Sequence, residues 1–148
     1  MPNARLAQVA DLASLLELYR LAEVSRSAEP MERAERIWLE MLSDNGVAVF
    51  VSAANAQIVA TCVLITAPNL LRAGRRHGFL ENVVSHPEFR GQGHGRAVVH
   101  AALAAAWTKD CYHVLLQSGR EDPRVHRFYQ HCGFEPGFRV GYVARRPT

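Results

Sequence analysis

The sequence predicts a mixed α/β domain, in which helices flank a largely antiparallel sheet. Three observations support this fold class. Strand and helix patterns follow one another in the order β α α β β β α β α β, two adjacent β-rich runs are typical of a hairpin, and an alanine-rich helix follows the central strands. With 148 residues, the chain is expected to form one domain over residues 1–148.

The first half of the chain contributes a short strand, two helices and the hairpin. Residues 3–9 are expected to form the strand, and Asp11 to cap a helix with one apolar face. Pro30 suits the first position of a second helix, which Asn45-Gly46 ends. That helix has apolar residues at helical spacing, namely Met31, Ala34, Ile37, Trp38, Met41 and Leu42. Residues 47–52 and 58–66 then predict an antiparallel hairpin.

The second half alternates strands and helices. A loop over 67–78 leads to a strand at 79–85, which His86-Pro87 stops. Residues 96–107 are nearly apolar throughout, which predicts a buried helix. A strand over 112–117, a helix over 123–132 and a final strand over about 138–145 complete the chain. Trp38 and Trp107 both lie on apolar helix faces and are expected to pack in the core.

Composition excludes several classes of protein. The net charge of +3 and the pI near 9.0 would suit an anionic ligand, but they are too weak to indicate a nucleic-acid partner. No apolar run is long enough for a membrane span. An odd number of irregularly spaced cysteines favours a reducing compartment, so we expect a cytoplasmic protein. The histidines lack the spacing of a zinc pair and no CxxC is present, so no metal is expected.

The stretch FRGQGHGR, residues 89–96, is the strongest local signal. It lies between a predicted strand and a predicted helix, where unpaired backbone amides and the helix dipole favour a phosphate. Arg90 and Arg96 would add positive charge. No lysine of a Walker loop follows, and Arg96 stands where a dinucleotide fingerprint has its third glycine. A plain glycine-rich turn is the alternative.

The motif Arg90-Gly91-Gln92-Gly93-His94-Gly95 resembles the acetyl-CoA pyrophosphate motif R/Q-x-x-G-x-G/A of the GNAT superfamily of N-acetyltransferases. Residues 80–87 resemble that family's fourth strand, and residues 125–134 its late helix with F-Y-x-x-x-G-F. The resemblance implies the GNAT fold, with the strands at 79–85 and 112–117 splayed apart.

The resemblance also implies a binding site for acetyl-CoA as cosubstrate. The pantetheine arm would pair with the main chain near residues 83–85, and the pyrophosphate would lie on the amides of residues 92–96. The cofactor-binding residues implied are Val83, Val84, Ser85, Arg90, Gly91, Gln92, Gly93, His94, Gly95 and Arg96. For Val83 and Val84, simple strand burial is a compatible reading.

Two residues are candidates for catalysis. Tyr129 matches the family's helical tyrosine and would protonate the leaving thiolate, since a phenol carries its proton at neutral pH. The alternative for Tyr129 is a core aromatic beside Phe128. Glu81 would act as the base that deprotonates the amine, directly or through a water. Binding substrate, or pairing with an arginine, is the alternative for Glu81.

The expected reaction is acetyl transfer to a primary amine of a small molecule, by direct attack in a ternary complex. The motif wording is similar to glucosamine-phosphate N-acetyltransferases, but Asn82 stands where those enzymes usually have a second acid. An amino sugar, a polyamine and an amino acid therefore stay open as acceptors. A cluster of Arg72, Arg75 and Arg76 could recognise an anionic acceptor or be a solvated loop. An acyl-CoA-binding regulatory module and a protein or peptide N-acetyltransferase are the alternatives, and the resemblance implies a homodimer.

Overall fold

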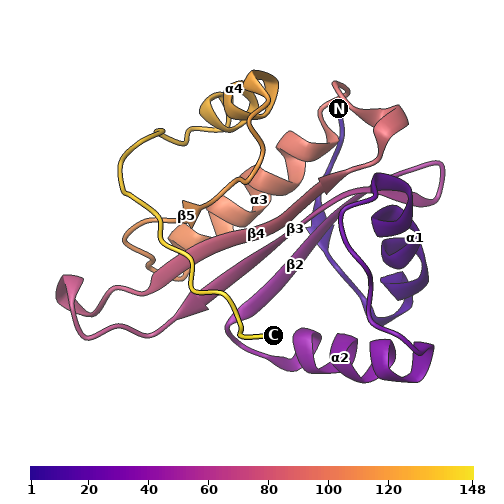
Figure 1. Ribbon diagram of the computed structural model, residues 1–148, viewed down its shortest axis with the longest axis horizontal. Coiled ribbons are helices and arrows are strands. Elements are labelled where there is room, and N and C mark those ends of the chain that lie inside the picture. The colour runs from indigo at the N-terminus through magenta and orange to yellow at the C-terminus, as the bar shows by residue number, and fades with distance from the viewer. The chain divides into compact units, whose positions relative to one another are not determined.

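The computed structural model describes residues 1–148 as two compact units, Met1–Leu116 and Gln117–Thr148. The first unit contains a five-stranded sheet in the order β1-β2-β3-β4-β5 (Figure 1). The strands are β1 (Arg5–Leu6), β2 (Val47–Ala54), β3 (Gln57–Ala67), β4 (His77–Ser85) and β5 (Leu115–Leu116). Neighbours are antiparallel from β1 to β4, and β4 and β5 are parallel, which confirms the predicted mixed and mostly antiparallel sheet.

The predicted hairpin is β2 and β3, joined by the two-residue turn Asn55-Ala56. Both turn residues have positive φ, 51° and 61°, as a type I′ turn requires. That turn matches the right-handed twist of the flanking strands, and it sets the register in which Ala54 opposes Gln57.

Helices α1 (Leu12–Ala22) and α2 (Met31–Ser43) cover one face of this sheet, and α3 (His94–Thr108) covers the other (Figure 1). The two faces can be told apart on β3, where neighbouring side chains point in opposite directions. Val63 packs in the cluster below α1 and α2, whereas the Cys62 thiol reaches the Val98 carbonyl of α3 at 3.2 Å.

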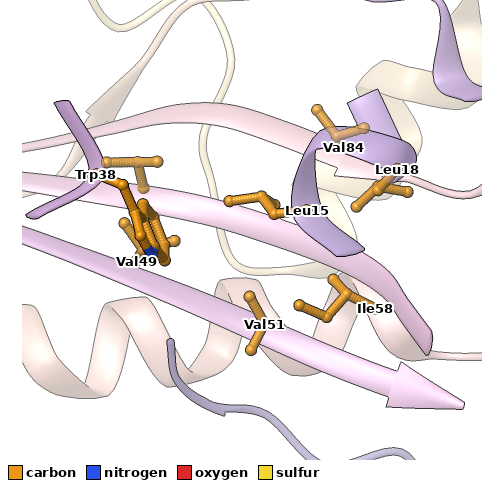
Figure 2. Packing of buried hydrophobic residues seen from close by; sticks show 8 residues of the cluster. Leu15, Leu18, Trp38, Val49, Val51, Ile58 and Val84 are labelled. Atoms are coloured by element: carbon orange, nitrogen blue, oxygen red, sulfur yellow. The ribbon is translucent and has the colours of Figure 1, made fainter. Parts of the chain in front are cut away.

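The core on the side of α1 and α2 is a compact apolar cluster (Figure 2). Its buried members come from both helices and from three strands: Leu15, Leu18, Trp38, Val49, Val51, Ile58, Val63 and Val84. The Trp38 indole N–H donates to the Val9 carbonyl at 3.1 Å, which satisfies its one polar group. The prediction that Trp38 is a core residue is thus confirmed.

Helix α3 begins at His94 and is amphipathic, not buried on all sides as predicted. Its sheet-facing side buries Val98, Val99, Ala102 and Ala106. Trp107 is 53% exposed, so the prediction that it packs in the core is wrong. Because Ala106 already occupies the inward position of that turn, the next residue points outward.

Two predicted helix signals differ in detail. The Asp11 carboxylate caps no α1 amide; it accepts from the Gln8 amide at 2.7 Å and from the Arg5 guanidinium at 2.7 Å. It therefore closes a short 3-10 turn, Val9–Asp11, that precedes α1. Helix α2 begins at Met31, one residue after Pro30.

The strand predicted over 112–117 is much shorter, since only Leu115–Leu116 pair with β4. Asp110 has a φ of 60°, and Cys111 forms only an isolated bridge with Arg76. This left-handed turn after α3 delays regular pairing until Leu115.

The second unit contains α4 (Pro123–His131), close to the predicted range. The Asp122 carboxylate accepts from the Arg124 amide at 2.9 Å, and Pro123 occupies the first turn. The strand predicted over 138–145 is absent: these residues form no ladder, and Tyr142 is 90% exposed. A β-prone segment needs a partner strand for its backbone groups, and the unit of 117–148 contains none.

No helix is long and apolar enough to cross a bilayer.

Candidate functional site

The glycine stretch forms the entry to α3. Gly91 and Gly93 have positive φ angles of 76° and 93°, and Gly93 is the N-cap residue. A glycine cap has no side chain to bond the first amides of the helix, and the first helical bond runs from the Ala97 amide to the Gly93 carbonyl at 3.0 Å. The amides of the first turn consequently point out of the helix end, where the positive end of the dipole lies.

Beside this loop is a shallow cavity of about 510 Å³. It lies on the side of β1 and β2, away from β4, and is lined by Met1, Pro2, Asn3, Arg5, Val51, Ala53 and His94. A Cβ placed on Gly93 would lie 3.4 Å from Pro2 Cγ. Nothing lies within 4 Å of a Cβ placed on Gly91. The loop therefore offers main chain without side-chain bulk at two positions, which suits close approach of an anion such as a phosphate.

His94 is the residue of this stretch whose structural role was not predicted. Its ring points inward, where Nδ1 lies 2.8 Å from the Ser52 hydroxyl of β2. The two residues are 8% and 1% exposed, so this is a buried polar pair between the sheet and the first turn of α3. The Nδ1 atom of His94 is thus engaged by Ser52, and the residue also lines the cavity.

Contacts between the side chains of His86, Phe89 and His94 support the loop on its other side. The Phe89 ring lies edge-on between the rings of His86 and His94, with centroid distances of 5.2 and 6.1 Å. His86 is itself buried, and its Nδ1 accepts from the Glu88 amide at 3.1 Å. These contacts and the Ser52 hydrogen bond fix the amides of the loop before any ligand arrives. Sequence reasoning missed both, because no local pattern shows that His86 and Ser52 are near α3.

Strand β4 carries a β-bulge in the middle of the predicted site. Val63 opposes Glu81 and Thr61 opposes Val84, so β4 has one residue more than β3 in this interval. Asn82 has a φ of 51°, a conformation that asparagine tolerates better than most residues. The extra residue places Glu81 and Val84 on the same face of the sheet, toward α1.

The opposite edge of β4 is open along the same residues. Pairing with β5 involves only Phe79 and Leu80, so no strand borders β4 on that side from Glu81 to Ser85. This is the divergence of the two strands that the resemblance implies. An edge of this kind presents main-chain donors and acceptors that an extended ligand can pair with.

The predicted site residues of the first unit therefore meet along β4 and the loop after it. Glu81 is exposed, Val84 is buried in the core, and Arg90 and Arg96 are exposed at the loop. Strand burial of Val84 is thus observed, and its main chain still lies on the open edge. Of the arginine cluster, Arg75 pairs with Asp110 at 3.3 Å and Arg76 is partly buried near Thr66.

Tyr129 belongs to the second unit and lies on α4. Its ring makes edge contacts with Phe128 at 5.2 Å and Phe134 at 6.0 Å between centroids. The Phe134 amide donates to the Tyr129 carbonyl at 3.1 Å, and this hydrogen bond closes the C-terminal end of α4. Both ring partners belong to the same unit as Tyr129.

All three cysteines are buried and none is in a disulfide, and no group of three or more His, Cys, Asp or Glu side chains is arranged to hold a metal ion. Burial raises the pKa of the Cys62 thiol to about 12. A thiol that stays protonated at neutral pH is not a nucleophile.

The fold and this site define a class, and the comparison with known families agrees: the chain belongs to the acetyltransferase (GNAT) family, whose model matches residues 12–134. It is an acetyltransferase enzyme. Among its relatives is a glucosamine 6-phosphate N-acetyltransferase of Trypanosoma brucei brucei, 29% identical over 88% of this chain and 86% of the relative.

Two further relatives extend the comparison. An aminoglycoside N(6')-acetyltransferase type 1 of Stenotrophomonas maltophilia is 32% identical over 95% of this chain and 91% of its own. A solved structure from Agrobacterium tumefaciens is 40% identical and has a TM-score of 0.89, covering 97% of this chain and 99% of that one. The GNAT fold predicted from the sequence is therefore confirmed.

Proposed function

We propose that the protein transfers an acetyl group from acetyl-CoA to a primary amine of a small molecule, by direct attack within a ternary complex. One observation carries this proposal: the uncapped first turn of α3 is joined by residues 86–93 to a strand whose edge is open beside Glu81. A diphosphate on the amides of residues 92–96 would leave the pantetheine arm beside residues 83–85. The acetyl group would then lie near the bulge.

The donor-binding residues in this proposal are those of the open edge and of the loop. Most would act through the main chain, since His94 is turned inward and three positions are glycine. Arg90 and Arg96 would add positive charge at the diphosphate. A cradle made of backbone explains why the loop needs glycine at positions with positive φ.

The chemistry requires one bond to form and one to break. The amine nitrogen bonds to the acetyl carbonyl carbon, and the bond between that carbon and sulfur breaks. Glu81 would take the first proton from the ammonium group, directly or through a water, so that the nitrogen lone pair can attack. Tyr129 would give its phenol proton to the leaving thiolate. The second proton lost by nitrogen, as the amide forms, restores the phenol.

The acceptor class rests on the relatives, which are named for acetylation of glucosamine 6-phosphate and of an aminoglycoside. Both names describe amines on sugar rings. We also propose that residues 1–148 act as one catalytic domain, because the family match crosses the boundary between the two units. A homodimer is a further part of the proposal, and the apolar side chains exposed in the segment after Gly137 suit a protein contact.

Donor binding can be tested by calorimetric titration with coenzyme A. In Gly93→Ala, a non-glycine residue would have to adopt a φ near +93°, at a cost of about 1–2 kcal/mol, or the loop would have to rearrange. We expect affinity to fall about tenfold. Gly137→Ala is the matched control, because its φ of 70° carries similar strain outside the loop. If both variants bound coenzyme A as tightly as the wild type, the proposed binding of the diphosphate by the loop amides would be contradicted.

Catalysis can be tested by coenzyme A release, followed with a thiol reagent over a panel of amines. Tyr129→Phe should lower kcat more than it weakens acetyl-CoA binding, and unchanged kcat would remove its assigned role. Glu81→Gln should abolish the acidic limb of the pH–rate profile, and a retained limb would exclude Glu81 as the base. Acetyl-CoA binding with no thiol release for any amine would favour a regulatory binding module instead.

A further inference from the structure

The face of the sheet that carries Glu81 continues beyond the core as an open surface. On β4, Gly78 and Leu80 are buried, with Gly78 covered by residues 111–114, and the alternate residues His77, Phe79 and Glu81 point the other way. Phe79 is 37% exposed, and its cross-strand partner Ile65 is 38% exposed. The cluster below α1 and α2 includes Val63, the partner of Glu81, but not these two residues.

Aromatic rings line this surface in a row that starts beside Glu81. The rings of Phe79 and His77 stack, with centroids 6.1 Å apart and planes 25° from parallel. The His77 ring then makes an edge contact with Tyr112 at 5.9 Å. We call Phe79, His77 and Tyr112 the ring row.

A guanidinium group stands at the far end of the ring row. Arg72 lies over the Tyr112 ring, with its central carbon 5.2 Å from the ring centroid, and forms no ion pair. Its neighbour Arg75 is neutralised by Asp110 instead. The loop that carries both arginines projects at the left of Figure 1, at the start of β4. The row thus runs from a carboxylate, across three rings, to an unpaired cation.

We infer that the acceptor is an amine carried on a ring system, with an acidic group at the end remote from the amine, and that it lies along the ring row. This deepens the proposed function and depends on it. Glu81 would attract the ammonium end, and the flat faces of Phe79 and His77 would contact a ring better than a flexible chain. Arg72 would bind the carboxylate or phosphate at the other end.

The dimensions select the length of the acceptor. From Glu81 to His77 is four residues of strand, or about 13 Å at about 3.3 Å per residue. Arg72 lies beyond Tyr112, past that point. A single sugar ring with its phosphate is shorter than this span, so two linked rings or a ring with an extended acidic substituent fits better. A linear polyamine has neither a ring for the row nor an anion for Arg72.

Three matched amines test this inference in the thiol-release assay. The first is a para-linked aminomethyl-biphenyl-carboxylate, the second is its neutral carboxamide, and the third is aminoundecanoate, a linear amine with a terminal carboxylate. We expect kcat/KM to be highest for the biphenyl carboxylate. In Arg72→Gln it should fall about tenfold for that acceptor, as expected for a lost charge-assisted contact, and little for the carboxamide. Arg75→Gln is the control and should leave both unchanged.

Phe79→Ala should raise the KM of both biphenyl amines and leave that of acetyl-CoA unaltered. A linear amine used as well as the biphenyl carboxylate, or equal effects of Arg72→Gln and Arg75→Gln, would overturn the inference while the proposed function stands. If no amine releases thiol, the proposed catalysis fails. Calorimetric binding of the same three amines to wild type and Arg72→Gln then decides whether the ring row binds them in the predicted order.

Discussion

The buried hydrogen bond between Ser52 and His94 gives the sharpest test of how the cradle is held. Ser52→Ala removes the hydroxyl and leaves His94 Nδ1 without its partner at a buried position, since the two residues are 1% and 8% exposed. Leaving a buried polar group unsatisfied costs about 1–3 kcal/mol. For a chain of this size, that corresponds to a fall in Tm of about 2–4 °C per kcal/mol.

The effect on ligand binding follows from the place of the bond. His94 is the first residue of α3, so its ring ties the first turn to β2. Without that tie the first amides are free to move, and ordering them costs free energy when the ligand binds. We expect the KM for acetyl-CoA and the Kd for coenzyme A to rise about three- to tenfold. The kcat at saturating donor should change little.

Two controls separate this effect from a general loss of stability. Ser43→Ala removes an exposed hydroxyl that bonds the Glu40 carbonyl, and it should change stability by less than about 0.5 kcal/mol. Replacing both partners, as in Ser52→Ala with His94→Leu, removes the unsatisfied group and should recover part of the stability lost in Ser52→Ala. Chemical denaturation measures stability, and calorimetry measures binding. If Ser52→Ala matches Ser43→Ala in both, the reasoning is refuted; if only stability falls, the bond supports the fold and does not position the cradle.

Three further results are expected. Leu18→Ala should cost about 2–5 kcal/mol in chemical denaturation, because Leu18 is fully buried in the core cluster; a loss below 1 kcal/mol would contradict that packing. Burial raises the pKa of both Cys62 and Tyr19 to about 12, so at alkaline pH the folded state keeps protons that the unfolded chain loses. The contribution of these groups to the free energy of unfolding should be complete below about pH 9 and should decrease as the pH rises. In a series of Tm measurements against pH, Cys62→Ala should reduce the first part of that decrease. The hydrogen bond from Arg5 lowers the pKa of Asp11, so the ion pair stabilises the fold above the ordinary pKa of 3.8, and this stabilisation disappears as the pH falls below that value. Asp11→Asn should remove this part of the dependence of stability on acid pH. An unchanged profile of Tm against pH would contradict a contribution of Asp11.

Much of the fold was predictable because its signals are local. The hairpin of β2 and β3 and the helices α1, α2 and α4 have the periodicity and end residues that define them. The loop before α3 was predictable for the same reason, since glycines at a strand-to-helix junction describe the backbone directly. The family match then confirmed what the motif at residues 90–95 had indicated.

The features that escaped prediction depend on contacts between distant parts of the chain. Ser52 and His94 are 42 residues apart, and neither has a local reason to be buried. The segment over 138–145 has the composition of a strand, but composition cannot supply the partner that a strand needs. Trp107 belongs to a helix whose sheet-facing side is already filled by Val98, Val99, Ala102 and Ala106, and the composition of the helix does not show on which side Trp107 lies.

The bulge at Asn82 explains how β4 can contribute to the core and to the proposed site at the same time. In a regular strand Glu81 and Val83 would share a face, and Val84 would point toward α3. Because of the extra residue, the side chains of Val84 and Glu81 point to the same face of the sheet. Val84 is buried there in the core and anchors the strand, whereas Glu81, three residues earlier, stays exposed. The same interval has no partner on its outer edge. Through Val84, the main chain that borders the proposed ligand is anchored in the core although it lies at the edge of the sheet. Burial of Val84 therefore holds both the Glu81 side chain and the unpaired main chain of β4 in place. Without the bulge, Val84 and Glu81 would point to opposite faces of the sheet, so either Val84 would leave the core or Glu81 would turn to the other face.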